Sequence, residues 1–225
     1  MTGGRLLAID TSGTSALIAL SEPDGTPIAE RRWQAGYRHG EELLTRIDAM
    51  LTESNTPMTD LGGIVVGTGP GAFTGLRVGL ATAKALARGL GIPLAGVPTS
   101  EALLTAASRA GAVKGTKAVL LLPAGPSDRV VVAGGRAVLL RGGDEPSLED
   151  GSELVAVDLP DRAPADAIER GRRAEVGLGT ALLWIGARRI AAGGDDIALL
   201  VPEYVTLPRG VPAVTGEVRW SNDPR

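Results

Sequence analysis

Two short segments carry the residue types that could bind an anion or a nucleotide. One is the DTS run at residues 10–12, which follows the first apolar run and combines a carboxylate with two hydroxyl groups. The other is the GTGPG run at residues 67–71, which separates a β-branched run from a helical pattern. A glycine turn that leads into a helix can present free backbone N–H groups to an anion. The candidate nucleotide or anion loop consists of Asp10, Thr11, Ser12, Gly67, Gly69 and Gly71.

The glycine run matches neither of the two best-known phosphate motifs. It has no Gly-Lys-Ser/Thr ending, and its spacing is not GxGxxG. A tight connection between a strand and a helix needs glycine for its turn alone, and Asp-Thr-Ser-Gly is itself a favourable turn. Both interpretations therefore stay open, and the spacing favours a plain turn.

The histidine and cysteine content argues against a metal site and against a hydrolase. His39 is the only histidine, and the chain has no cysteine. A zinc or iron site built on a histidine pair or on thiolates is therefore excluded, and no spaced carboxylate cluster indicates magnesium. We expect no metal site and no catalytic residue, and the missing GxSxG elbow argues against a hydrolase. His39 is either a partner contact at a helix start, or a local cap or surface histidine.

Apolar runs and helical periodicity predict the elements that position these residues in the first half of the chain. The predicted order is three strands, then helix, strand, helix, strand and helix. Such an order favours an α/β fold with a mixed sheet and packed helices. The strands are expected at 6–10, 16–20, 27–33, near 64 and at 94–97, and the helices at about 39–54, from 73, and at about 100–110.

The second half repeats this order weakly. Strands are expected at 117–122, 129–133, 136–140 and 153–157, and a helix at 180–192. Between them, residues 158–173 are rich in Asp, Arg and Pro and show little periodicity, so we expect a surface excursion there. The predicted division is an N-terminal lobe at 1–112, a reduced second lobe at 113–205 and a flexible tail at 206–225.

Two of the predicted helices carry more apolar positions than one buried face needs. In the helix from residue 73, small residues recur at helical spacing, and polar side chains fill only a narrow strip. Such a helix needs cover on more than one side, and small residues let another helix approach closely. The cover is either the chain's own fold or another subunit, which could be a second copy. The candidate partner interface consists of His39, Leu43, Leu44, Ile47, Leu51, Gly75, Leu76, Val78, Gly79, Ala83 and Leu86.

The composition indicates the cellular compartment and the classes of molecule that the chain can bind. The net charge is −3, and the arginine pairs are isolated, so the chain does not carry the basic face of an autonomous RNA-binding protein. The absence of cysteine fits a reducing compartment. No window is apolar enough for a membrane span or a signal segment. We expect a cytoplasmic protein that contacts no membrane and reaches RNA only through partners.

Several segments resemble the TsaB family, the bacterial partner subunits of the machinery that makes threonylcarbamoyladenosine in tRNA. GPGAFTGLRVG at 69–79 is similar to that family's GPGSFTGLRxG signature. LLAIDTSGTSALIAL at 6–20, HGEELL at 39–44 and GIPLAGVPTSEAL at 91–103 resemble further family segments. The resemblance covers about the first 105 residues, with a weaker echo at 202–205.

The resemblance implies two ribonuclease-H-like lobes of the actin-like ATPase (ASKHA) class. It also implies a non-catalytic subunit that binds and activates the catalytic TsaD subunit through its two N-terminal helices. A TsaE-like ATPase would dock on the pair, and a homodimer could form through the same helices. At residues 123–129 the chain reads PAGPSDR, where the family often has an Asp-Ala-Arg segment.

The alternative is an independent actin-like ATPase or phosphotransferase that uses Asp10 and the glycine run. Enzymes of that architecture also need a second phosphate hairpin and an adenosine loop, and residues 117–205 show neither pattern. No cofactor is expected in this chain alone, although ATP or ADP at the boundary with a partner stays open.

Overall fold

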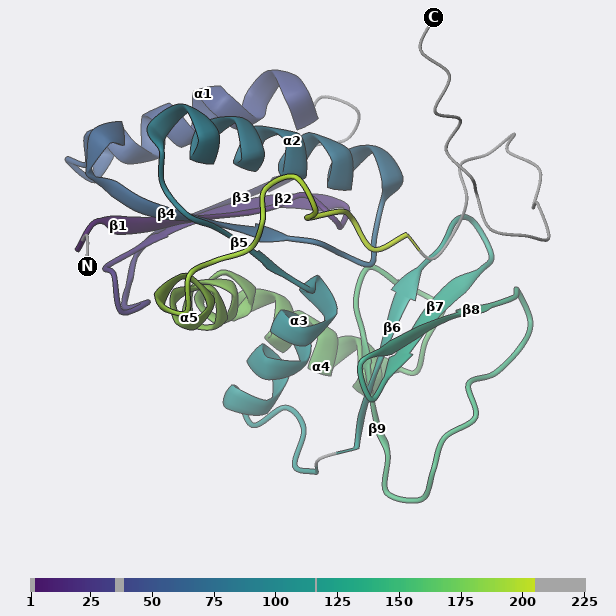
Figure 1. Ribbon diagram of the computed structural model, residues 1–225. Coiled ribbons are helices and arrows are strands. Elements are labelled where there is room, and N and C mark those ends of the chain that lie inside the picture. Colours follow the sequence, from purple (N-terminus) through teal and green to yellow (C-terminus); the bar gives the residue numbers. More distant parts are fainter. Residues whose placement is uncertain (1–2, 35–38, 116, 205–225) are drawn as a thin grey trace, which may run out of the picture.

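The computed structural model describes residues 3–34, 39–115 and 117–204, which form two mixed sheets with packed helices (Figure 1). The first sheet has the order β3-β2-β1-β4-β5. Strands β1 to β3 form antiparallel pairs, whereas β4 and β5 run parallel to β1. Its strands are β1 (Arg5–Asp10), β2 (Ser15–Ser21), β3 (Pro27–Gln34), β4 (Leu61–Gly67) and β5 (Leu94–Val97).

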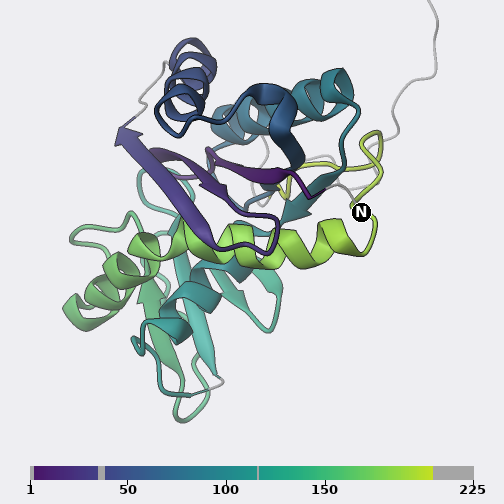
Figure 2. The same cartoon turned by 90° about the vertical axis from the view of Figure 1, so that its left-hand side faces the viewer.

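Helices cover both faces of this sheet (Figures 1 and 2). The helices α1 (His39–Glu53) and α2 (Phe73–Leu90) lie on one face, and a short 3-10 helix (Met58–Asp60) leads into β4. On the other face lies α5 (Leu178–Ala191), which contacts all five strands of the sheet and also packs against α3 (Thr99–Arg109). Strands β1, β2 and β4 are therefore buried almost throughout, which explains their continuous apolar runs.

The second sheet repeats the strand order of the first. Its order β8-β7-β6-β9 corresponds to β3-β2-β1-β4, with the same antiparallel and parallel pairings. The described residues contain no fifth strand in this sheet and no helix between β8 and β9. The expectation of two ribonuclease-H-like lobes, the second reduced, is confirmed. The strands are β6 (Ala118–Pro123), β7 (Arg129–Ala133), β8 (Arg136–Leu140) and β9 (Glu153–Ala156).

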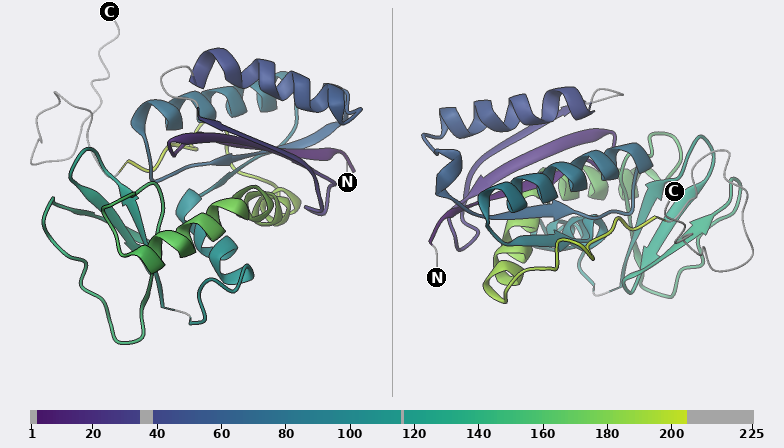
Figure 3. Two further views of the ribbon diagram at one scale, coloured as in Figure 1. Left: turned by 180° about the vertical axis from the view of Figure 1, so that it is seen from behind. Right: turned by 45° about the horizontal axis from the view of Figure 1, so that its top comes forward.

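One core cluster runs through both lobes. It joins residues of the first sheet, such as Leu6 and Val65, to Leu120 and Val155 of the second sheet and to Leu182 of α5. The boundary predicted at residue 113 therefore does not separate two hydrophobic cores, because α5 returns from the second half of the chain to cover the first sheet (Figure 3). The predicted tail at 206–225 lies outside the described residues.

The segment predicted as a surface excursion contains a helix, α4 (Ala165–Val176), which packs on β9. The prediction for residues 158–173 was therefore wrong. The buried stripe of α4 consists of Ala167, Gly171 and Ala174, whose small side chains give almost no apolar periodicity. Gly171 is required, because a Cβ there would lie 1.8 Å from the carbonyl oxygen of Ala156. The other predicted elements appear within a few residues of their expected bounds.

The described helices include none with the length and apolar character that spanning a membrane requires.

A close approach of α5 to the first sheet, at Gly186, yields a stability prediction. A Cβ on Gly186 would lie 2.3 Å and 2.6 Å from the two methyl carbons of Val65, whose β-branched side chain is stiff. Gly186→Ala should therefore lower the free energy of unfolding by about 1–3 kcal/mol relative to Gly89→Ala. At Gly89 in α2 a Cβ meets nothing within 4 Å, so both variants gain helix propensity but only one gains a clash. Equal stability of the two variants in urea unfolding would contradict the close packing.

Candidate functional site

The fold brings the two segments of the predicted anion loop together at one end of the first sheet. The DTS run leaves β1, the glycine run leaves β4, and α3 begins beyond the end of the neighbouring β5. This edge is where open α/β sheets commonly bind ligands. Asp10, Thr11 and Ser12 are nevertheless only 2%, 2% and 5% exposed.

The Asp10 carboxylate is fully engaged inside the chain. Its Oδ1 accepts hydrogen bonds from the Ser12 backbone N–H at 2.9 Å and the Ser12 hydroxyl at 2.7 Å. Its Oδ2 accepts from the Thr99 hydroxyl at 2.6 Å, and that hydroxyl accepts from the backbone N–H of Gly69 at 3.2 Å. The three loops at this edge are thus tied together through one buried carboxylate. We call Asp10, Ser12, Gly69 and Thr99 the strand-end cluster.

Thr99 was missed as a member of this cluster. Thr99 is the first residue of α3, which has no side-chain cap and whose N-cap residue is Pro98. The Thr99 hydroxyl points instead to a residue 89 positions away in the sequence. A hydroxyl two residues after the end of a buried strand was the local signal for this role.

The glycines of the run create space for neighbouring protein atoms. A Cβ on Gly67 would lie 1.8 Å from Oδ2 of Asp10, and a Cβ on Gly71 would lie 2.2 Å from the carbonyl oxygen of Ser12. That carbonyl accepts the backbone N–H of Ala72 at 2.6 Å. Gly69 also has a φ of +103°, which L side chains rarely adopt. These glycines serve the turn and the close approach of the loops.

The small residues of α2 also face this edge. The Thr11 hydroxyl donates to the carbonyl oxygen of Gly75 at 2.6 Å, and a Cβ on Gly79 would lie 2.2 Å from the same hydroxyl oxygen. The expectation that Gly75 and Gly79 admit another helix is therefore corrected, because the loop after β1 fills that space.

A carboxylate of the second lobe engages the turn between β1 and β2. Asp158 accepts the backbone N–H of Thr14 at 2.8 Å with Oδ2 and the Thr14 hydroxyl at 2.7 Å with Oδ1. Sequence reasoning missed this contact, which spans 144 positions. The hydroxyls of Thr11, Ser12, Thr14 and Thr99 and several backbone N–H groups at this edge are thus bonded to protein atoms. Nucleotide binding there stays an untested prediction that this geometry does not favour.

No three His, Asp or Glu side chains in the described ranges form a cluster that could hold a metal ion.

Most of the predicted interface residues lie in the protein's own core. Their burial follows from the packing of α1 and α2 on the first sheet, so these side chains cannot contact a partner directly, which corrects the prediction for them. The group consists of Leu43, Ile47, Leu51, Gly75, Leu76, Gly79 and Ala83. Leu44 is 54% exposed, and Val78 and Leu86 are half-buried beside the same core. The side chain of His39 lies outside the described residues. We call Leu44, Val78 and Leu86 the candidate partner face.

The segment before Tyr204 lies across the start of α2 (Figure 1). The Phe73 and Tyr204 ring centroids are 4.9 Å apart, and the Arg77 guanidinium lies 3.8 Å from the centroid of Phe73. Arg77 Nε donates to the Tyr204 hydroxyl at 3.0 Å, and the Glu203 backbone N–H donates to the carbonyl of Thr68 at 2.7 Å. This contact gives a structural role to residues that the sequence showed only as a weak family echo.

The structural role of Asp10 can be measured. Asp10→Asn replaces an acceptor by an amide that cannot accept all the hydrogen bonds of the strand-end cluster. We expect the free energy of unfolding to fall by about 1–3 kcal/mol. The control is Asp48→Asn, which changes an exposed carboxylate on α1. If Asp10→Asn leaves stability unchanged in urea unfolding but abolishes nucleotide binding, the structural assignment is wrong.

Glu203 gives a pH-dependent prediction. Burial raises the pKa of the Glu203 carboxyl above its ordinary value of 4.5. A raised pKa stabilises the folded protein at pH values below the ordinary value, and this stabilisation is lost as the pH rises through the folded pKa. Glu203→Gln should therefore raise the melting temperature at about pH 7 and leave it unchanged at about pH 3.5. A melting-temperature difference that is the same at both pH values would refute the assignment.

A sequence model of the family described as "TsaD: tRNA N6-adenosine threonylcarbamoyltransferase" matches residues 33–150, more than half of the chain. The chain is 38% identical to the "tRNA threonylcarbamoyladenosine biosynthesis protein TsaB" of Escherichia coli over 116 residues, which are 52% of this chain and 48% of that protein. With the Bacillus subtilis protein of the same name it shares 39% identity over 98 residues, 44% of this chain and 42% of that one. The matched segment spans about half the length of these relatives.

The solved structure of "YeaZ from Pseudomonas aeruginosa" matches 89% of this chain and 99% of its own with a TM-score of 0.70, at 21% identity. This likeness supports the fold. The family match, which covers more than half of the chain, shows that the chain belongs to the TsaD family, and the relatives at 38% and 39% identity carry the name TsaB.

Proposed function

We propose that this chain is a non-catalytic subunit of the complex that transfers threonylcarbamoyl to adenosine in tRNA. In this proposal it binds and activates a TsaD-like catalytic subunit and supports the docking of a TsaE-like ATPase. The observation that carries the non-catalytic role is the closed strand-end cluster. Asp10, the best candidate for a catalytic carboxylate, is 2% exposed and accepts hydrogen bonds from Ser12 and Thr99.

The names of the relatives support a role in the biosynthesis of threonylcarbamoyladenosine in tRNA. Two proteins that share 38% and 39% identity with this chain are named for the biosynthesis of threonylcarbamoyladenosine in tRNA. The family match at residues 33–150 supports an association with a TsaD-like protein, since homologous subunits often pair through equivalent surfaces. The TsaE-like partner rests on the family resemblance alone.

The exposed side of α1 and α2 is the proposed binding site for the catalytic subunit. Leu44 is 54% exposed on α1, and Val78 and Leu86 are half-buried on α2, which lies on the same face of the sheet as α1 (Figure 1). Exposed apolar side chains gain free energy when a partner removes them from water. A second copy of this chain could use the same face, so the homodimer stays a prediction that the mass of the purified chain in solution would test.

A matched pair of substitutions tests this face. Leu44→Asp places a charge on the candidate partner face, and Val176→Asp places the same charge at an 80% exposed position of α4, on the other side of the first sheet. Neither side chain belongs to the core, so both variants should fold. We expect Leu44→Asp to weaken binding of the TsaD-like protein from the same cell by about tenfold or more, a loss of about 1.4 kcal/mol. Val176→Asp should bind normally in the same titration.

Two results would contradict the proposal. If both variants bind the TsaD-like protein equally well and restore tRNA modification equally, the candidate partner face is wrong. If the purified chain alone binds ATP tightly and hydrolyses it, and Asp10→Asn abolishes both while the protein stays folded, the alternative of an independent ATPase holds.

A further inference from the structure

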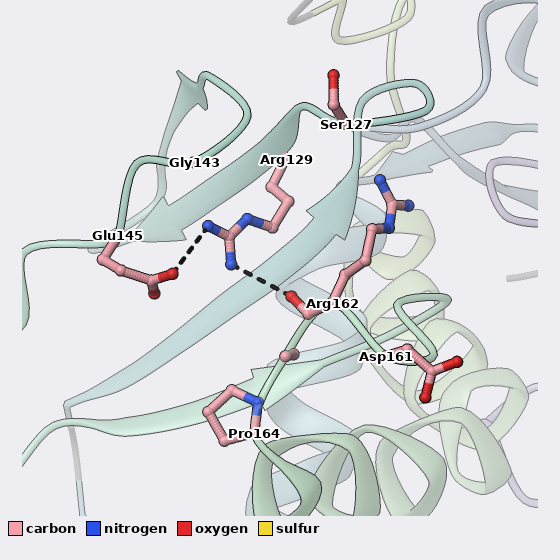
Figure 4. A pocket seen from close by; sticks show the side chains of 8 residues that line it. Ser127, Arg129, Gly143, Glu145, Asp161, Arg162 and Pro164 are labelled. Atoms are coloured by element: carbon pink, nitrogen blue, oxygen red, sulfur yellow. Dashed lines mark hydrogen bonds and ion pairs between the residues drawn. The ribbon is translucent and has the colours of Figure 1, made fainter.

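The second lobe contains an open pocket that the proposed function does not use. Its volume is about 450 Å³, within the range of small-molecule sites (Figure 4). The lining comes from the loop before β7, from β7 itself, from the loop between β8 and β9, and from residues 161–164 before α4. The strand-end cluster and the candidate partner face contribute no residue to this lining.

A buried guanidinium group, that of Arg129, lines this pocket. The Arg129 side chain is only 8% exposed. Its Nη1 donates to the carbonyl oxygen of Arg162 at 3.2 Å, and its Nη2 donates to the carbonyl oxygen of Asp144. These two acceptors are neutral. Taking a guanidinium out of water is costly unless an opposite charge compensates it.

The compensating charge of Arg129 is weakly held. Among the described residues, the carboxylate within ion-pair distance is that of Glu145, with its Oε1 3.5 Å from Nη2. The Glu145 side chain is 81% exposed, so it is well hydrated and pairs with the buried cation from the solvent side. Because the Glu145 carboxylate is well hydrated, its pairing with the buried Arg129 gains less Coulomb energy than a fully buried pair would, and a better anion can displace it.

The surroundings of Arg129 add positive charge. Arg162 also lines the pocket, and its Nη1 donates at 2.9 Å to the carbonyl oxygens of Gly125 and Pro126, which carry no formal charge. The N-terminus of α4 follows directly after Pro164 and has no side-chain cap. Asp161 opposes this charge, but Figure 4 shows its carboxylate turned away from the Arg129 guanidinium.

We propose that this pocket binds a small oxyanion ligand, a phosphate or carboxylate group, with Arg129 as the binding residue and Glu145 as a resident carboxylate that the ligand displaces. The planar guanidinium offers parallel N–H donors that match both kinds of oxyanion. Displacement returns the Glu145 side chain to water, where it already lies for the most part. The bound oxyanion then supplies the opposite charge that the buried Arg129 lacks.

The test is a titration of the full chain with inorganic phosphate and, separately, with acetate, followed by amide NMR shifts. Glu145→Gln removes the competing carboxylate and should tighten phosphate binding by about tenfold. The matched control is Glu149→Gln, which removes a 79% exposed carboxylate from the same loop and should leave the affinity nearly unchanged. The acetate titration distinguishes a general oxyanion site from one that prefers phosphate.

Arg129→Gln should abolish the shifts, whereas Arg141→Gln should preserve them, because Arg141 is a 75% exposed arginine of the same lobe that does not line the pocket. Glu145→Gln changes an exposed side chain, so it keeps the test valid even if Arg129→Gln does not fold. The proposal is overturned if phosphate and acetate fail to bind, or if Glu145→Gln and Glu149→Gln change the affinity equally. Neither result bears on the binding of a TsaD-like protein.

Discussion

The fold depends on one buried carboxylate that joins the ends of neighbouring strands. Asp10 accepts hydrogen bonds from the loop that follows it and from the first residue of α3, while Gly67 leaves the space that its Oδ2 occupies. Thr99 passes the connection on to Gly69, so the loops after β1, β4 and β5 form one unit. The starts of α2 and α3 are positioned by this unit. The residues that look most catalytic in the sequence therefore organise the lobe that carries the candidate partner face.

This arrangement supports the proposal that an actin-like lobe serves here as a binding subunit. The edge of the sheet where such folds commonly place ligands is filled by the chain's own hydroxyl, amide and carboxylate groups. The helices α1 and α2 take their places from the same sheet, and their outer side keeps Leu44 exposed. Two features of this lobe thus support the same proposal. The Asp10 carboxylate is hydrogen-bonded inside the chain, while the apolar side chain of Leu44 is exposed to solvent.

Local patterns predicted the strands and most helices, because apolar runs and helical periodicity are properties of neighbouring residues. The helix α4 was not predicted because its buried stripe consists of Ala167, Gly171 and Ala174, which carry little apolar surface. The interface prediction included residues such as Ile47 that lie in the core, because an apolar position looks the same whether its cover comes from the same chain or from another. Thr99 and Asp158 were missed because their partners are 89 and 144 positions away.

The contact between Asp158 and Thr14 also bears on how the molecule can move. Rotation of the second lobe against the first would break both hydrogen bonds of Asp158 and would separate side chains of the core that runs through both lobes. Packed cores resist such gradual deformation. Hinge closure, the motion by which two-lobed enzymes commonly enclose a substrate, is therefore costly for this chain. In the proposed complex, the chain would therefore bind its partner as a rigid body.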